Sequence, residues 1–154
     1  MEKIIPFLIK AKQNTYANSN SKRIAASRLG SYDLQYEGSI DGIPAIYHDT
    51  YFGGENFIGE EIVYLNGIPI WGMNYYGHAV DSQFYEEAIT LVLRPALMLV
   101  GKDGNLPLRG PTRMEHSDYL YTFNSTGTME YFSGIEQILK KHKLIYELKC
   151  FGAK

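Results

Sequence analysis

The sequence predicts an α+β fold in which an extended antiparallel sheet carries two main helices on one face. Three observations support it: a self-match at an offset of 75 positions (57 to 132), an Asn-Gly dipeptide between strand-like runs, and two segments with apolar residues at helical spacing. We therefore expect an internally duplicated domain, helix plus about four strands twice, with an approximate twofold axis. The matching residues are Phe57, Gly59, Glu61, Ile70, Trp71 and Gly77, which recur as Phe132, Gly134, Glu136, Ile145, Tyr146 and Gly152.

The first predicted element is a helix over residues 3 to about 16, with Lys10 and Lys12 on the side away from the core. Its core-facing residues are Ile4, Phe7, Leu8 and Ala11. A polar loop follows over 18–29, and then two short strands are expected at 32–37 and 45–51.

The clearest local prediction is a hairpin over 58–76 that turns at Asn66-Gly67, because Asn-Gly supplies both positive-φ positions of a type I′ turn. A two-residue loop pairs Val63 with Ile70 and Ile62 with Trp71, so that alternate residues share a face. Comparison with the second copy indicates that the Trp71 face is the core. Glu61 and Glu136 are then expected as exposed strand glutamates on the other face.

That other face also carries an apolar stripe, for which we expect cover by a helix, a loop or a second subunit. A homodimer would use this stripe, which consists of Val63, Leu65, Ile68 and Ile70.

Asp81 is predicted to cap a second helix, which Pro95 should break before a further turn or two through Leu99. The remaining strands are expected at 119–124, 129–139 and 144–151, and the last two form the second copy of the hairpin.

Length and composition favour one domain over 1–154, with repeat units of about 1–77 and 78–154. The chain is 45% hydrophobic, and its net charge of −2 provides no basic field for autonomous nucleic-acid binding. Its one cysteine, Cys150, cannot form an internal disulfide, and no apolar run has the length of a membrane span or a signal peptide. We expect a soluble cytoplasmic protein that does not act at a membrane.

Short motifs occur over nearly the whole chain: FLIKAK at 7–12, TYA at 15–17, SRLG at 27–30, DTYFGG at 49–54, FIGEE at 57–61, WGMNYYG at 71–77, LRPAL at 93–97, RGP at 109–111 and FSG at 132–134. With these motifs the chain resembles a bacterial family of small domains of unknown function, found alone or fused behind a helix-turn-helix. The resemblance implies no established activity, cofactor or catalytic residue. Members with a helix-turn-helix resemble regulators, which implies a sensing or oligomerising role.

A ligand site is predicted between the helices and the aromatic sheet face, with Arg94, Arg109, Tyr51 and Tyr76 as its residues. Guanidinium groups in an aromatic cavity would select a small anionic or nucleotide-like ligand. The structural alternative for Arg94 is a solvated position or a buried ion pair with Asp33, Asp49 or Glu61.

Acid-base chemistry is the alternative prediction, with His48, Asp49 and Glu61 as its residues. His48 and Asp49 are neighbours on a strand and should point to opposite faces, which favours structural roles for both. The four histidines show no metal-ligand spacing, so no metal or other cofactor is predicted. The sequence is thus interpreted as a non-enzymatic small-molecule-binding or regulatory module. An enzyme and a structural homo-oligomer or protein-interaction module are the alternatives.

Overall fold

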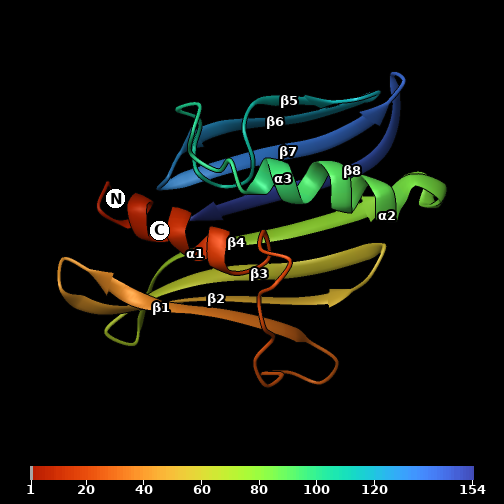
Figure 1. Ribbon diagram of the computed structural model, residues 1–154. Coiled ribbons are helices and arrows are strands. Elements are labelled where there is room, and N and C mark those ends of the chain that lie inside the picture. Colours follow the sequence, from red (N-terminus) through yellow and green to blue (C-terminus); the bar gives the residue numbers. More distant parts are fainter. Residues whose placement is uncertain (1) are drawn as a thin grey trace.

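The computed structural model describes residues 2–154, which form one eight-stranded antiparallel sheet and two helical segments (Figure 1). The first half contains α1 (Ile4–Asn14), β1 (Tyr32–Ile40), β2 (Ile43–Gly53), β3 (Asn56–Leu65) and β4 (Ile68–Ala79). The second half contains η1 (Ser82–Phe84), α2 (Tyr85–Ala88), η2 (Ile89–Leu93), α3 (Arg94–Leu97), β5 (Arg113–His116), β6 (Tyr119–Thr128), β7 (Tyr131–Lys140) and β8 (Lys143–Ala153). The predicted α+β class and antiparallel sheet are confirmed.

Two four-stranded meanders make up the sheet, whose strand order is β1-β2-β3-β4-β8-β7-β6-β5. They are joined where β4 pairs with β8, with Gly72 opposite Ala153 and Ala79 opposite Tyr146. Each half therefore has the same local topology, although the short edge strand β5 was not predicted from sequence. The internal duplication itself stays a prediction.

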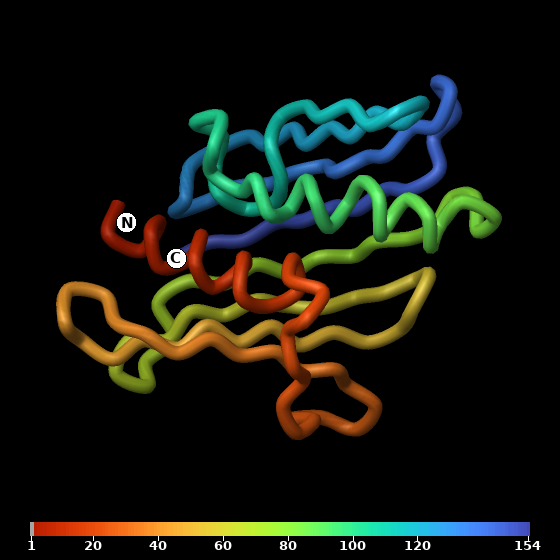
Figure 2. Tube along the Cα trace, viewed as in Figure 1, coloured from red at the N-terminus to blue at the C-terminus, as the bar shows by residue number. Residues whose placement is uncertain are grey.

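Both helical segments lie in front of the sheet in Figures 1 and 2, and their C-terminal ends approach each other. The side chain of Gln13 connects the two ends by donating a 3.0 Å hydrogen bond to the carbonyl of Met98. The second segment runs on through Pro95, although the sequence predicted a break there. The turn before it is π-helical, with the Arg94 N–H bonded to the carbonyl of Ile89, and this wider turn accommodates the proline.

A β-bulge in the β3–β4 hairpin changes which residues share a face. Asn66 and Gly67 have the positive φ values that the predicted turn requires, but Val63 pairs with Trp71 and leaves Ile70 without a partner. Because Ile70 is an extra residue in β4, the side chains of β3 up to Val63 lie on the opposite face from the one expected relative to Trp71 and the rest of β4. The predicted pairing of Val63 with Ile70 is therefore wrong. An equivalent irregularity in the β7–β8 hairpin leaves Ile145 unpaired.

The bulge divides the predicted apolar stripe. Val63 is fully buried on the same face as Trp71, whereas Leu65 and Ile70 are half-buried against the core. Only Ile68 is largely exposed, at 64%. Val63 therefore cannot take part in a contact between copies, and a homodimer through the rest of the stripe stays a prediction.

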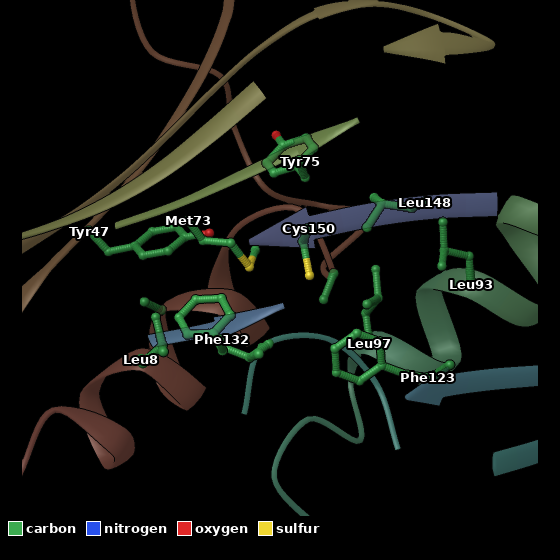
Figure 3. Packing of buried hydrophobic residues seen from close by; sticks show 14 of the residues in the cluster. Leu8, Tyr47, Met73, Tyr75, Leu93, Leu97, Phe123, Phe132, Leu148 and Cys150 are labelled. Atoms are coloured by element: carbon green, nitrogen blue, oxygen red, sulfur yellow. The ribbon is translucent and has the colours of Figure 1, made fainter. Parts of the chain in front are cut away.

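The hydrophobic core contains Trp71, as predicted, together with side chains from both helical segments. Figure 3 shows part of this core. Leu8 reaches it from α1, Leu93 and Leu97 from the second helical segment, and Cys150 from β8. No helix of residues 2–154 combines the length and apolar character that crossing a membrane requires.

Phe57 lies directly opposite Gly77, and its ring covers that glycine. A Cβ at position 77 would lie 2.3 Å from the ring, so any residue other than glycine would force the Phe57 ring to move. Phe132 and Gly152 repeat this arrangement in the β7–β8 hairpin, which accounts physically for the recurrence of both residue types at the offset of 75.

Candidate functional site

Five charged residues are buried together between the helices and the sheet: Lys12, Asp49, Glu61, Arg109 and Glu136. None is more than 4% exposed. Burying a charge is costly unless it is paired, so the partners of each group determine what the cluster can do.

Lys12 of α1 forms a salt bridge with Glu61 of β3, and both side chains are completely inaccessible. Burial lowers the pKa of Lys12, and the charge of Glu61 opposes this effect. The predicted outward position of Lys12 is wrong because it lies four residues after Leu8, on the same helix face. The predicted exposure of Glu61 is wrong because the bulge turns it toward the core.

Arg109, in the connection before β5, holds Glu136 of β7 with two nitrogens. Nε lies 3.1 Å from Oε1, and Nη2 lies 2.8 Å from Oε2. Tyr121 donates a further hydrogen bond to Oε1 over 2.6 Å, and Tyr146 donates to Oε2 over 3.2 Å. Burial alone would lower the pKa of Arg109, but the charge of Glu136 raises it well above its ordinary value. Glu136 is therefore a fully bonded carboxylate rather than the predicted exposed glutamate.

Asp49 is the acid of the cluster that has no cation of its own. It lies directly opposite Glu61 in the β2–β3 pairing, and burial together with the charge of Glu61 raises its pKa to about 7. Tyr75 donates a 2.6 Å hydrogen bond to its Oδ1. Within residues 2–154, its Oδ2 atom has no hydrogen-bond partner, and neither has the buried Oε1 atom of Glu61. The cluster thus holds three carboxyl groups and two cations.

Gly59 allows Tyr75 to reach Asp49. Tyr75 faces Gly59 across the β3–β4 pairing, and a Cβ at position 59 would lie 2.4 Å from the tyrosine hydroxyl. The absence of a side chain there lets the ring lie across β3 and place its hydroxyl group on the carboxylate.

Asp49 lines a cavity of about 680 Å³ between the sheet, the segment after α1 and the second helical segment. Arg94, Arg109 and Tyr51 also line it, at the position where the sequence predicted a ligand site. Six aromatic side chains contribute to the wall: Tyr16, Tyr32, Tyr51, Phe57, Tyr75 and Tyr85.

A family model described as a domain of unknown function, DUF5680, matches residues 49–154. The chain belongs to this family. The DUF5680 match includes Asp49, Glu61, Arg109 and Glu136, whereas Lys12 lies before it. No curated protein and no solved structure matches the chain.

The structure does not bring together all four residues that were predicted to bind a ligand. Tyr76 is half exposed on the opposite face of the sheet, because it alternates with the buried Tyr75. Arg94 lies at the cavity but is solvent-exposed, and no salt bridge to it occurs within residues 2–154. Arg109 is at the cavity and buried, with its charge already paired to Glu136.

The three residues predicted for acid-base chemistry likewise lie on two different faces of the sheet. Asp49 and Glu61 share the buried face, whereas His48 lies on the other side of the sheet and contacts Asp33 at 2.8 Å. Burial alone would raise the pKa of Asp33, but hydrogen bonds from Ser27, Ser31, Thr50 and His48 hold it well below its ordinary value. Among the described residues, no group of three His, Cys, Asp or Glu side chains could hold a metal ion.

Proposed function

We propose that this DUF5680 chain is a non-enzymatic small-molecule-binding domain with a sensing role, and that its ligand occupies the cavity above Asp49. The observation that carries the proposal is Asp49, a buried carboxyl that lines the cavity and whose hydrogen bond from Tyr75 is to Oδ1, so that Oδ2 has no partner in the described residues. A volume of about 680 Å³ is in the range of small-molecule sites, which combine apolar walls with a few convergent polar groups.

The buried salt bridges beside the cavity support a functional role. Buried ion pairs contribute little net stability, and apolar residues of similar volume often stabilise a core equally well or better. Lys12–Glu61 and Arg109–Glu136 hold charges in fixed positions close to Asp49, as binding and catalytic sites often do. The resemblance to domains fused with a helix-turn-helix supports the regulatory part of the proposal.

The proposal is tested by filling the cavity. Ile89 lines it, whereas the neighbouring Thr90 is exposed and does not, so Ile89→Trp and Thr90→Trp form a matched pair. Thermal-shift screening of small metabolites against the parent protein should find stabilising compounds, because a ligand at 100 times its Kd adds about 2.7 kcal/mol. That stabilisation should survive Thr90→Trp and disappear in Ile89→Trp.

Two results would contradict the proposal. One is a broad screen in which no compound stabilises the parent protein. The other is stabilisation that Ile89→Trp leaves intact, because the ligand would then bind outside the cavity.

Proton transfer at Asp49 is a second candidate function, favoured by the pKa of about 7 at this buried carboxyl. A general base operates best when its pKa lies near the working pH. Glu61 would tune Asp49 through its charge, whereas His48 is too far removed to take part. If a ligand from the screen is turned over, Asp49→Asn should lower its kcat by about 100-fold or more. Turnover that survives this substitution would exclude Asp49 as the base.

A further inference from the structure

We infer that the ligand of the cavity is an organic cation, a protonated amine carried on an aromatic group, with Asp49 as its counter-ion. This inference rests on the proposed function, because it names the class of ligand for the same cavity.

The first argument is the balance of buried charge. Glu61 neutralises Lys12, and Glu136 neutralises Arg109, so that Asp49 is the one carboxyl of the cluster left without a cation. A protonated amine at its Oδ2 atom would supply the missing charge and the missing hydrogen-bond donor together. A buried carboxylate that gains such a partner changes from a destabilising group to a satisfied one.

The second argument is the aromatic wall. The faces of tyrosine and phenylalanine rings attract cations, and six such rings line the cavity. One cation of the chain already uses this wall: the guanidinium carbon of Arg23 lies 3.8 Å from the ring centroid of Tyr32. The same guanidinium donates a 3.1 Å hydrogen bond to the hydroxyl of Tyr51. Two rings of the lining, Tyr32 and Tyr51, thus already contact a flat cationic group.

The third argument is that the charges lining the cavity do not favour the small anionic ligand that the sequence predicted. Arg109 uses Nε and one terminal nitrogen on Glu136, so its charge is compensated before any ligand arrives. Beyond that pair, the lining holds the acids Asp49, Glu55 and Glu86 and the bases Arg23 and Arg94. The remaining balance is acidic, and the most deeply buried of these charges is Asp49.

The experiment compares three probes that share an indole ring and differ in charge: tryptamine, the neutral tryptophol and the anionic indole-3-propionate. Their affinities are measured at pH 8 by amide chemical-shift titration of the ¹⁵N-labelled protein, with Ile89→Trp as the control for binding in the cavity. We expect tryptamine to bind at least about tenfold more tightly than tryptophol, with indole-3-propionate weakest. In Asp49→Asn, tryptamine and tryptophol should bind within about twofold of each other.

A second pair of variants tests whether the acidic lining favours a cation, without changing the buried cluster. Glu86 lines the cavity and Glu87 does not, although both are exposed on α2. Glu86→Gln should weaken tryptamine binding about two- to threefold, and Glu87→Gln should leave it unchanged.

The outcomes separate this inference from the proposed function. Equal binding of all three probes, or tightest binding of indole-3-propionate, would overturn the cation assignment while leaving a binding cavity in place. Undiminished tryptamine selectivity in Asp49→Asn would also overturn it. If none of the three probes binds, the cation assignment fails, whereas the proposed function is decided by the wider screen with Ile89→Trp.

Discussion

Replacing Asp49 by Asn should stabilise the protein, and the gain should grow with pH. In the unfolded chain an aspartate has a pKa of about 3.9, whereas burial and the charge of Glu61 raise the pKa of Asp49 to about 7 in the folded state. Between these two values the folded state binds the proton more tightly than the unfolded state does. The parent protein therefore loses stability as the pH rises from about 4 to about 7.

The size of this effect follows from the two pKa values. Each unit of difference corresponds to 1.36 kcal/mol, so the raised pKa removes up to about 4 kcal/mol from the folded state above pH 7. Asparagine cannot ionise, yet its side-chain oxygen can still accept the hydrogen bond from Tyr75. The advantage of Asp49→Asn over the parent should accordingly be small at pH 4.5 and reach about 2 to 4 kcal/mol at pH 8.

Urea denaturation at several pH values measures this difference, with the fluorescence of Trp71, the only tryptophan, as the probe. The exposed Glu130 provides a control, because Glu130→Gln should change stability by less than about 0.5 kcal/mol throughout. A free energy difference that is independent of pH would refute the reasoning. So would a variant that is less stable than the parent at pH 8.

Three further predictions concern the stability of other variants. Lys12→Met should lower the free energy of unfolding by about 3 to 5 kcal/mol, because it leaves the buried Glu61 unpaired. Adding Glu61→Gln should restore most of this loss. Additive losses in the double variant would mean that the two residues are not coupled. Gly59→Ala should lower the free energy of unfolding by about 1 to 3 kcal/mol, because the new Cβ would lie 2.4 Å from the Tyr75 hydroxyl. The same variant should also weaken ligand binding. An unchanged Tm would show that the Tyr75 ring moves freely. His142→Gly should raise stability by about 1 kcal/mol, since His142 has a φ of 67° in the turn before β8, and no gain would indicate a compensating contact of the imidazole.

The sheet could be predicted from the sequence because its signals are local. Asn66-Gly67 specifies its turn by backbone geometry alone, and the offset of 75 places a second hairpin around β7 and β8. Trp71 was assigned to the core correctly, because the equivalent face of the second copy is apolar, whereas the opposite face of that copy is largely charged.

The buried cluster was missed because it depends on a bulge in each of the two hairpins and on contacts between distant segments. A strict two-residue period places Glu61 outside, and only the bulge at Ile70 turns it inward. Lys12 was placed in solvent on the strength of its charge, although its spacing from Leu8 indicated the core face. The pairing of Arg109 with Glu136 joins residues whose separation along the chain carries no periodic signal.

The seam between β4 and β8 connects the two halves of the sheet, and the cavity wall includes residues from both halves. Asp49 and Tyr75 belong to the first half, whereas Tyr85, Arg94 and Arg109 belong to the second. The proposed ligand, if it contacts both groups, would therefore connect the two meanders across the seam and should restrain their movement relative to each other.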